Sequence, residues 1–397
     1  MLILDASTFE TVSWEEKFPF GRRWRTADNL IVSFLSELSR CILSNKDAKQ
    51  YPDLITFGFF CRKSNIKAEI QKVSDRQTSV GWGTLLHITP SNIPINFAYS
   101  FVMGLLAGNS NIVRLPSKSY PQNDLLLKLL TDIFSAKIFL DLSNATKFVQ
   151  THRESKKLDG LLLRCDGLNV WGSDETVTNF RKRPKKARCV EVYFPNRASS
   201  TVLSAQHYLD MNIEQKNKVA HSFFNDTYLV DQNACSSPTN IFWLGSYQAI
   251  EKAKRIFWER LASELGDSYS LDPVARIDKI LDVMDICKAE DKAISVSEWH
   301  PDLLIIEERC GSKYPLRFGT FAEVYVESLD EISQFLRPNE QTITTLGVDP
   351  IDVYRTLVEN NFLIADRIVP IGRALDIGLQ WDGKKMMEVL SRKVEVR

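Results

Sequence analysis

The stretch GTLLHITPSNIPINFAYSFVMGLLAGNSNIVRLPSK, residues 83–118, carries the pattern that decides the fold of this chain. It begins with a short apolar run over 84–88, continues into an apolar helical segment that ends at Leu106, and returns to a second apolar run over 111–115. Short runs separated by one helix are typical of parallel strands joined by crossover helices. The stretch therefore predicts one strand–helix–strand unit of a doubly wound α/β sheet.

The same alternation continues on both sides of this unit. Toward the N-terminus, apolar residues at three- and four-residue steps predict a helix over Asn29–Leu43, with Asp28 as its N-cap. After the opening unit we expect a helix over 122–135 and strand-like pieces at Gly160–Cys165 and 168–171. The remaining predicted elements are helices from 174 and at 213–229, 247–265, 277–287 and 329–336, and strands at 201–203, 239–244, 302–307 and 322–326.

Composition and charge narrow the class of protein. The 397 residues include 50 basic and 50 acidic ones, so nothing points to nucleic acid or to an anionic membrane as the main partner. No apolar run reaches the roughly 18 residues of a membrane span, and the first residues lack the pattern of a secretory signal. We therefore expect a cytoplasmic protein whose thiols are reduced.

One of the seven cysteines occupies a polar turn. Cys235 lies in Asp231-Gln-Asn-Ala-Cys-Ser-Ser-Pro, between a predicted helix and a predicted strand. Backbone amides in such a turn can stabilise a thiolate and the oxyanion that forms when sulfur attacks a carbonyl. We expect the other cysteines to be small buried side chains. From spacing alone, Cys235 could equally be a loop cysteine without function.

Two polar segments follow the predicted strands of the opening unit, where α/β sheets bind ligands. Asn92, in Thr89-Pro-Ser-Asn-Ile-Pro, could offer its side-chain amide to a substrate oxygen. Alternatively, Ser91 or Asn92 could cap the helix that follows. Arg114 and Lys118 could contact a ribose or a phosphate, or they could be solvated surface cations.

A third polar segment, Trp171-Gly-Ser-Asp, precedes another predicted helix. Free amides and the helix dipole make Gly172 and Ser173 a weak phosphate site, without the GxGxxG spacing of a dinucleotide fingerprint. The five histidines show no HxxH or HExxH spacing, so we expect no metal site. The sequence also lacks a GxSxG elbow and a GxxxxGK[ST] loop.

The order of these segments resembles that of the aldehyde dehydrogenase superfamily. A Pro-x-Asn-x-Pro turn around Asn92 is followed by Ala-Gly-Asn-x-x-Ile-Val-Arg-x-Pro-Ser, by Gly172-Ser173 and by a Gln-x-x-Cys turn. The closer resemblance is to the acyl-CoA reductase branch, the LuxC family of bacterial fatty acid reductases. The endings are similar as well, here Asp366-Arg-Ile-Val-Pro-Ile-Gly-Arg-Ala-Leu-Asp, Trp381-Asp-Gly and Leu390-Ser-Arg. The resemblance covers roughly residues 80–397.

This resemblance implies an α/β fold of the aldehyde dehydrogenase type, with a Rossmann-like cofactor domain and an α/β catalytic domain. We expect a helical segment over residues 1–78 and a nucleotide-binding domain over 79–197, with a boundary near Pro195. The catalytic thiol domain would span 198–370. Residues 371–397 would return to the cofactor domain or to an oligomer interface.

The resemblance also assigns roles to individual residues. Cys235 matches the family's nucleophile, and Asn92 matches the amide that holds the oxyanion. The residues implied to bind the cofactor are Gly172 and Ser173 beside the pyrophosphate, and Arg114, Ser117 and Lys118 near the adenosine ribose. Leu115 stands where the superfamily usually has the lysine of Lys-Pro-Ser, so ribose contacts must come from other groups. Positive charge at Arg114 and Lys118 is compatible with a 2′-phosphate, and the family also implies NADPH.

Glu191, in Cys189-Val-Glu-Val-Tyr-Phe, stands about where oxidising aldehyde dehydrogenases have the general base of Glu-Leu-Gly-Gly. Here Tyr193 and Phe194 replace the two glycines. A reductase should exclude water rather than activate it, because hydrolysis of the acyl-enzyme competes with hydride transfer. Glu191 is therefore either a catalytic base or a structural residue.

The function implied by the resemblance is NADPH-dependent reduction of a fatty acyl thioester, acyl-CoA or acyl-protein, to an aldehyde through an acyl-cysteine. The alternatives are an NAD-dependent aldehyde dehydrogenase working in the oxidising direction and a catalytically silent scaffold for a partner ligase. The family further implies an acyl-protein synthetase as partner, and we expect a homo-oligomer.

Overall fold

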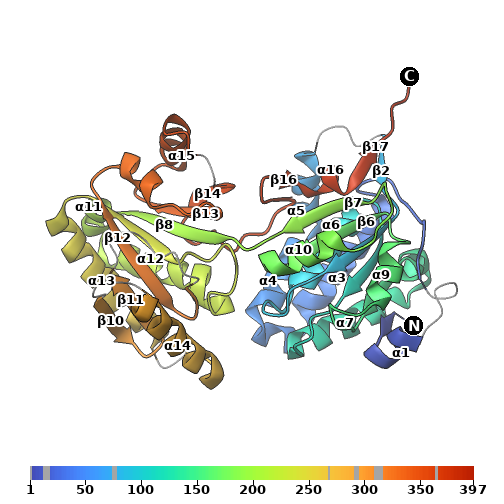
Figure 1. Cartoon of the computed structure of the whole chain (residues 1–397), viewed down its shortest axis with the longest axis horizontal. Coiled ribbons are helices and arrows are strands. Elements are labelled where there is room, and N and C mark those ends of the chain that lie inside the picture. The colour runs from blue at the N-terminus through green and yellow to red at the C-terminus, as the bar shows by residue number, and fades with distance from the viewer. Residues whose placement is uncertain are drawn as a thin grey trace. The chain divides into compact units, whose positions relative to one another are not determined.

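The computed structural model describes residues 2–11, 18–73, 78–266, 269–289, 295–307, 316–362 and 365–397. It forms two compact units, the first made of Met1–Asn196 with Ile377–Arg397 and the second of Arg197–Asp376 (Figure 1). Each unit is an α/β layer structure around its own, almost entirely parallel sheet. The predicted α/β class with parallel sheets is therefore confirmed.

The first unit is built on a six-stranded parallel sheet with the order β1-β5-β4-β3-β6-β7. The strands are β1 Ile3–Leu4, β3 Thr84–Ile88, β4 Ser110–Arg114, β5 Thr146–Val149, β6 Gly167–Trp171 and β7 Val190–Phe194. From β3 the chain first adds β4 and β5 on one side and then returns to add β6 and β7 on the other. The strand order therefore reverses between β3 and β6, which is the place where doubly wound sheets form a ligand crevice.

Helices cover both faces of this sheet because both faces are apolar. One face is covered by five helices that share the largest apolar core of this unit: α3 Asn29–Ser44, α4 Pro52–Phe60, α5 Lys63–Gln71, α6 Asn96–Leu106 and α7 Pro121–Phe134. The opposite face is covered by α9 Lys157–Leu162 and α10 Asp174–Lys182. The predicted N-cap of α3 is confirmed, since the Asp28 carboxylate accepts from the Leu30 N–H over 2.8 Å.

The first and last parts of the chain belong to this unit. Apolar residues of α3, α4 and α5 share one core with α6 and with the sheet. Near the C-terminus, β17 Ser391–Lys393 pairs antiparallel with β2 Ser79–Gly81, and Met386 and Met387 of α16 enter the same core. The smaller elements are α1 Ala6–Thr11, η1 Asp47–Gln50, η2 Lys137–Phe139, α8 Leu140–Asn144, β15 Gln380–Trp381, β16 Lys384–Lys385 and α16 Met386–Val389.

One predicted strand of this unit is wrong. Residues 160–165 were expected to be strand-like, but the chain forms α9 over Lys157–Leu162. Leu158, Leu161 and Leu162 are spaced as on one side of a helix, and they pack under the sheet beside Leu168. A short apolar run does not by itself distinguish a strand from a buried helix.

The second unit contains a seven-stranded sheet with the order β10-β11-β12-β9-β8-β13-β14, parallel except at its β10 edge. The strands are β8 Ala198–Ser204, β9 Asn240–Leu244, β10 Ser295–His300, β11 Leu303–Glu307, β12 Thr320–Val326, β13 Glu340–Leu346 and β14 Arg367–Pro370. The helices are α11 Ala205–Asp210, α12 Ile213–Thr227, η3 Tyr228–Val230, α13 Tyr247–Leu265, α14 Pro273–Ala289, η4 Leu329–Gln334 and α15 Pro350–Glu359. The helix predicted over 329–336 is therefore a short 3₁₀ segment.

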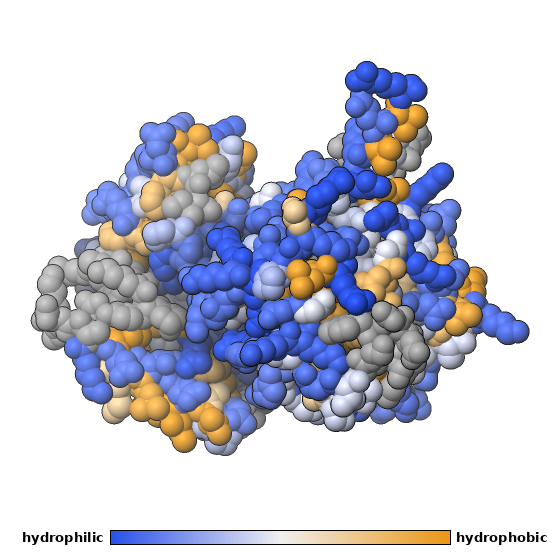
Figure 2. All heavy atoms as spheres, turned by 45° about the vertical axis from the view of Figure 1, so that its right-hand side comes forward, coloured by the Kyte–Doolittle hydropathy of each residue, from blue (hydrophilic) through white to orange (hydrophobic). Residues whose placement is uncertain are grey.

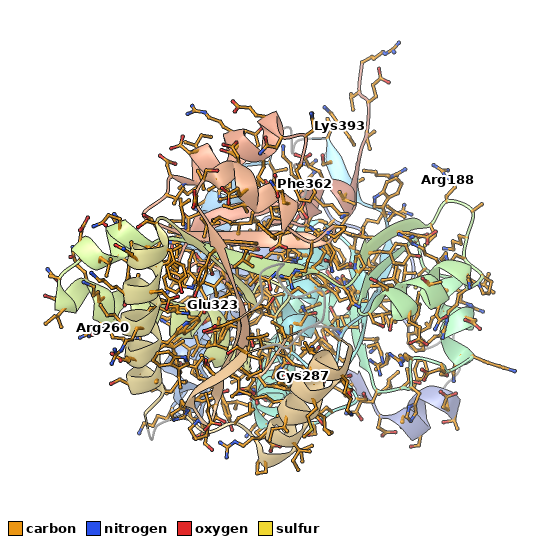
Figure 3. The ribbon with its side chains drawn as sticks, turned by 60° about the vertical axis from the view of Figure 1, so that its left-hand side comes forward. Arg188, Arg260, Cys287, Glu323, Phe362 and Lys393 are labelled. Carbon is orange, nitrogen blue, oxygen red and sulfur yellow. The ribbon has the colours of Figure 1, made fainter. Side chains whose placement is uncertain are left out.

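An aromatic core fixes α12 and α13 against this sheet. Phe223, Phe257 and Trp258 pack with Trp243 of β9, and all four are fully buried. The buried Glu323 carboxylate of β12, labelled in Figure 3, accepts from the indole N–H groups of Trp243 over 2.9 Å and Trp258 over 2.6 Å. These bonds satisfy a buried acceptor that would otherwise destabilise the core.

Candidate active site

All strands of the first unit's sheet are parallel, so their carboxyl ends lie at one edge. The segments that follow β3, β4 and β6 contain Asn92, then Ser117 and Lys118, then Gly172 and Ser173. The structure therefore brings five of the predicted site residues to the same edge of one sheet. This is the edge at which open α/β sheets bind their ligands.

The loop that carries Asn92 is tied to the loop that carries Ser117. Ser91 Oγ lies 2.9 Å from Ser117 Oγ and accepts from the Ser117 N–H over 3.2 Å. The Tyr120 hydroxyl donates to the Ser91 carbonyl oxygen over 2.8 Å. Asn92 itself is exposed, and α6 begins only at Asn96 after Ile95, so neither Ser91 nor Asn92 stands at its N-cap position.

Arg114 is a buried residue that holds strand ends together. Its Nε donates to the Thr151 carbonyl oxygen over 3.0 Å, and its Nη1 donates to the Thr89 carbonyl oxygen over 3.3 Å. Burial, together with the nearby Arg153, lowers the pKa of the Arg114 guanidinium below its ordinary value. These bonds link the segments after β3 and β5, so the geometry favours a structural role over the cofactor contact expected for Arg114.

A pocket of about 280 Å³ opens beside the ends of β4 and β5. Ser117 and Lys118 line it, with Tyr120, Asn123 and His152 among the other lining residues. The Lys118 ammonium lies 5.1 Å from the centre of the Tyr120 ring, a cation–π distance. Asn123 is almost fully buried, and its Oδ1 has no hydrogen-bond partner within the part of the chain that the structure describes.

The size and chemistry of this pocket fit one half of a dinucleotide. Its volume lies near the lower end of the range for ligand pockets, so it is too small for a whole dinucleotide. The buried Asn123 oxygen needs a donor, and the exposed Lys118 and His152 can contact an anionic group. His152 was not predicted because β5 was not recognised, and the run Thr146-Lys-Phe-Val before a polar segment was the available signal. Asn123 was not predicted because it lies in the first turn of α7, where its residue type alone does not indicate burial against a pocket.

Gly172 and Ser173 form the turn between β6 and α10. The Ser173 hydroxyl caps α10 by accepting from the Thr176 N–H over 3.2 Å. A Cβ on Gly172 would lie 3.0 Å from the Thr176 side chain, so the turn has little room for a larger residue. Two acidic residues of the first turn, Asp174 and Glu175, already complement the positive end of the helix.

Glu191 lies away from this edge. It is the second residue of β7 and is paired in register with Leu168, three residues before each strand ends. Its carboxylate accepts a hydrogen bond from the Tyr193 hydroxyl and forms a 3.3 Å ion pair with Lys185. The structure therefore favours the structural alternative for Glu191.

Cys235 belongs to the second unit, in the turn between η3 and β9, and it is exposed. Its carbonyl oxygen accepts from the Ser199 hydroxyl over 2.7 Å, while Ser199 Oγ also accepts from the Thr342 N–H over 3.1 Å. The neighbouring Ser236 and Ser237 are buried. The turn is therefore fastened to β8 and β13, with the cysteine at its exposed surface.

Gln232, the glutamine of the Gln-x-x-Cys turn, fixes the other side of this turn, and no local pattern in the sequence predicted this anchoring role. Its Nε2 donates to the carbonyl oxygens of Pro238 over 2.9 Å and Thr320 over 3.1 Å. Its Oε1 accepts from the N–H groups of Gly319 over 2.9 Å and Thr320 over 3.2 Å. Gln232 is almost fully buried, so these four bonds lock the turn to the start of β12.

The remaining described cysteines differ from Cys235 in their surroundings. Cys61 and Cys165 are fully buried, which raises the pKa of each thiol well above its ordinary value. Cys41 and Cys189 were also expected to be buried but are half-buried, and partial burial raises the pKa of Cys189 to about 11. Cys287, on α14, was expected to be buried but is exposed, because it lies on the helix side that faces away from the sheet. Cys310 lies outside the described residues.

The part of the chain that the structure describes contains neither a metal-binding cluster nor a membrane-spanning helix. No group of three or more His, Cys, Asp or Glu side chains in the described ranges is arranged to hold a metal ion. None of the helices in those ranges is both long and apolar enough to cross a membrane.

Comparison with known proteins identifies the family. The family model described as "Acyl-CoA reductase (LuxC)" matches residues 67–393. A curated protein of Vibrio harveyi, "Long-chain acyl-protein thioester reductase", is 24% identical over 278 residues, which cover 69% of this chain and 55% of the relative. This chain thus spans about half the length of the curated relative that it matches.

Solved structures show the fold. An NAD-dependent benzaldehyde dehydrogenase from Corynebacterium glutamicum is 9% identical, with a TM-score of 0.64, over 93% of this chain and 85% of that chain. The propionaldehyde dehydrogenase of Rhodopseudomonas palustris, solved with propionyl-CoA, is 13% identical with a TM-score of 0.59, over 92% of this chain and 88% of that chain. The expected fold of the aldehyde dehydrogenase type is therefore confirmed.

Proposed function

This chain belongs to the acyl-CoA reductase (LuxC) family, and from that premise we propose that it reduces a fatty acyl thioester to an aldehyde with NADPH. The acyl group would be held on Cys235 during the reaction. The observation that carries this proposal is an exposed cysteine on a turn that Ser199 and Gln232 fix from two sides. A fixed, accessible thiol suits a nucleophile, because the sulfur is presented to substrate without a cost of ordering the turn.

The chemistry assigned to Cys235 has two covalent steps. Its thiolate bonds to the acyl carbon, and the carbon–sulfur bond of the incoming thioester breaks to release the CoA or carrier thiolate. A bound nicotinamide cofactor supplies the hydride that the acyl carbon then accepts. The bond between that carbon and Cys235 breaks, so that aldehyde leaves and the thiolate returns.

Asn92 is the proposed side-chain donor to the oxyanion that precedes each bond cleavage. One such donor is typically worth about 3 kcal/mol in the transition state. The Ser117 N–H and the Tyr120 hydroxyl donate to Ser91 and hold the loop that carries Asn92. The position of Asn92 therefore depends on the neighbouring loop that is proposed to bind the cofactor. Glu191 is not needed as a base, because the proposed reaction activates no water.

The pocket at the ends of β4 and β5 is the proposed site for the adenosine half of the cofactor. Ser117 would contact the ribose, and Lys118 with His152 would contact a 2′-phosphate, which favours NADPH over NADH. Arg114 would contribute to this site only by holding the backbone of Thr89 and Thr151 in place. Gly172 and Ser173 remain the proposed turn beside the pyrophosphate.

The acyl donor is proposed to be a long-chain acyl group on CoA or on a protein. The name of the Vibrio harveyi relative, an acyl-protein thioester reductase, favours the protein-bound form. An acyl-protein synthetase is then the proposed partner, and a homo-oligomer in the cytoplasm is the proposed state of the enzyme.

Intact-mass analysis after incubation with acyl-CoAs of varied length tests nucleophile, substrate and direction together. We expect an adduct of one acyl group that NADPH discharges as aldehyde and that Cys235→Ala abolishes. Cys287→Ala is the matched control, because it removes the other exposed thiol among the described residues and should leave the adduct unchanged. An adduct that persists in Cys235→Ala, or NADH formation from aldehydes without any reduction of thioesters, would overturn the proposal.

A further inference from the structure

Helix α14 carries a row of exposed apolar side chains along one side. Val274, Ile277, Leu281 and Met284 are between 52% and 66% exposed, and Ile280 beside them is 49% exposed. In Figure 2, hydrophobic side chains gather at the lower left of the view, on the unit that carries this helix. Contiguous apolar surface of this kind on a protein usually marks a place where something binds.

The spacing of the row is that of a helix-pairing seam. Positions 274, 277, 281 and 284 repeat at steps of three and four residues, which are the a and d positions of two heptads. The opposite side of α14 is already used, since Ile286 packs with Ile306 and Ala322 of the sheet and Lys279 is buried. The exposed side therefore has the pattern that a second helix would fill.

The two borders of the row differ in charge. Asp278 and Asp285 follow Ile277 and Met284, so both aspartates occupy the same border of the seam. Lys288, at the end of the row, forms an exposed 3.7 Å ion pair with Asp285, and the three side chains together carry one net negative charge. The other border is formed by Ile280 and by Cys287, which Figure 3 labels on this helix. Residues at these flanking positions set which partner a seam accepts.

We propose that α14 is the docking site for an amphipathic helix of a different protein, one whose apolar row is bordered by lysine or arginine. The cationic border would face Asp278 and Asp285 while its apolar row covers Ile277 and Leu281. This inference goes beyond the proposed reductase activity and does not depend on it.

A second copy of this chain is a poorer occupant. In an antiparallel pairing of α14 with itself, the border that carries Asp278 and Asp285 faces the same border of the other copy, which is repulsive. Another exposed apolar row of this unit, on α15, contains Ile351, Tyr354 and Val358. Its border is also net negative, with Asp352 and Glu359 around an Arg355 that already pairs with Asp352. An anionic membrane would meet the same repulsion.

The test uses the full-length chain and two synthetic helical peptides of about three heptads. Both peptides carry the same Ile and Leu seam, and one has lysine and the other glutamate at the bordering positions. Fluorescence anisotropy of the labelled peptides measures binding to the wild-type chain, to Leu281→Ser, and to the double variant Asp278→Lys, Asp285→Lys. Leu281 and Asp285 are exposed and Asp278 is half-buried at the border of the row, and circular dichroism checks that each variant keeps the fold.

We expect the wild-type chain to bind the lysine peptide at least about tenfold more tightly than the glutamate peptide. Leu281→Ser should weaken that binding about tenfold, and the double variant should reverse the preference. Equal binding of both peptides, or unchanged binding to Leu281→Ser, would overturn the proposal. So would light scattering that shows dimers lost in Leu281→Ser, or binding to phosphatidylglycerol vesicles lost in the same variant.

Discussion

The side chain of Gln232 is hydrogen-bonded twice to the backbone of Thr320. Its Nε2 donates to the Thr320 carbonyl oxygen over 3.1 Å, and its Oε1 accepts from the Thr320 N–H over 3.2 Å. The amide therefore pairs with one residue of β12 as a neighbouring strand would. Because Gln232 stands three positions before Cys235, this contact couples the exposed thiol to the sheet.

Replacing Gln232 tests this coupling. Gln232→Met keeps the length but loses all four bonds, and buried backbone groups left without partners typically cost 1–3 kcal/mol each. We expect the free energy of unfolding to fall by about 3 kcal/mol, measured by urea denaturation. The rate of Cys235 alkylation by iodoacetamide should also change, while Cys287 provides the internal reference.

Gln232→Glu is the informative control for this variant. Its carboxylate still accepts from Gly319 and Thr320, but it faces the carbonyl oxygens of Pro238 and Thr320 without a proton to donate. Lowering the pH should partly restore stability, because a protonated carboxyl donates one bond. If Gln232→Met is as stable as the wild type and its Cys235 is alkylated at the same rate, Gln232 does not couple Cys235 to the sheet.

His87 gives a pH-dependent prediction for the first unit. Its Nε2 lies 2.9 Å from Asn111 Oδ1, which can only accept, and its Nδ1 lies 2.8 Å from Ser100 Oγ. Ser100 Oγ already accepts from Asn169 and Trp171, so its own hydrogen is available for Nδ1. The imidazole is therefore neutral, with its proton on Nε2, and burial lowers its pKa to about 4.

The sign of the resulting pH effect follows from this lowered pKa. Between pH 6.5 and about 4 the unfolded chain binds a proton at His87 that the folded chain does not, so stability falls as the pH falls through this window. The loss approaches about 1.4 kcal/mol per pH unit. Denaturation of the wild type and of His87→Gln at several pH values measures it. An equal slope in both proteins would contradict the prediction.

Lys118 should decide between the two nicotinamide cofactors. In Lys118→Ser we expect the KM for NADPH to rise about tenfold, because one charge-assisted contact to a phosphate is lost. The KM for NADH should change little, since NADH lacks that phosphate. Lys128→Ser is the matched control, because Lys128 is an exposed lysine of α7 that does not line the pocket. Equal effects on both cofactors would remove Lys118 from phosphate recognition.

Glu191→Gln should keep the reductase activity within about twofold, because the carboxylate is engaged with Tyr193 and Lys185 rather than lying at the site edge. Steady-state rates with acyl-CoA, compared with those of Tyr193→Phe, measure this. A fall of a hundredfold or more in kcat, the usual effect of removing a general base, would restore a catalytic role for Glu191.

Much of the fold was predictable because local patterns in the sequence determine it. The helical spacing and the cap at Asp28 predicted α3, and the run 84–88 predicted β3. The order Asn92, Gly172, Cys235 was enough to suggest the family, since each turn lies at a fixed point of the strand–helix alternation. Periodicity failed at 160–165, where a short apolar run formed α9 instead of a strand.

The sequence by itself determined the α/β class, the family and the candidate nucleophile, because these depend on residues that are neighbours along the chain. Only the tertiary structure decided which polar side chains are available. It buried Arg114 against two carbonyl oxygens, paired Glu191 with Lys185, and joined Lys118 to Asn123 and His152 around one pocket. It also made Gln232 the anchor of the Cys235 turn through contacts with residues 319 and 320. Hydrogen bonding and burial between segments so far apart in the chain arise only when the strands are aligned, so no local pattern encodes them.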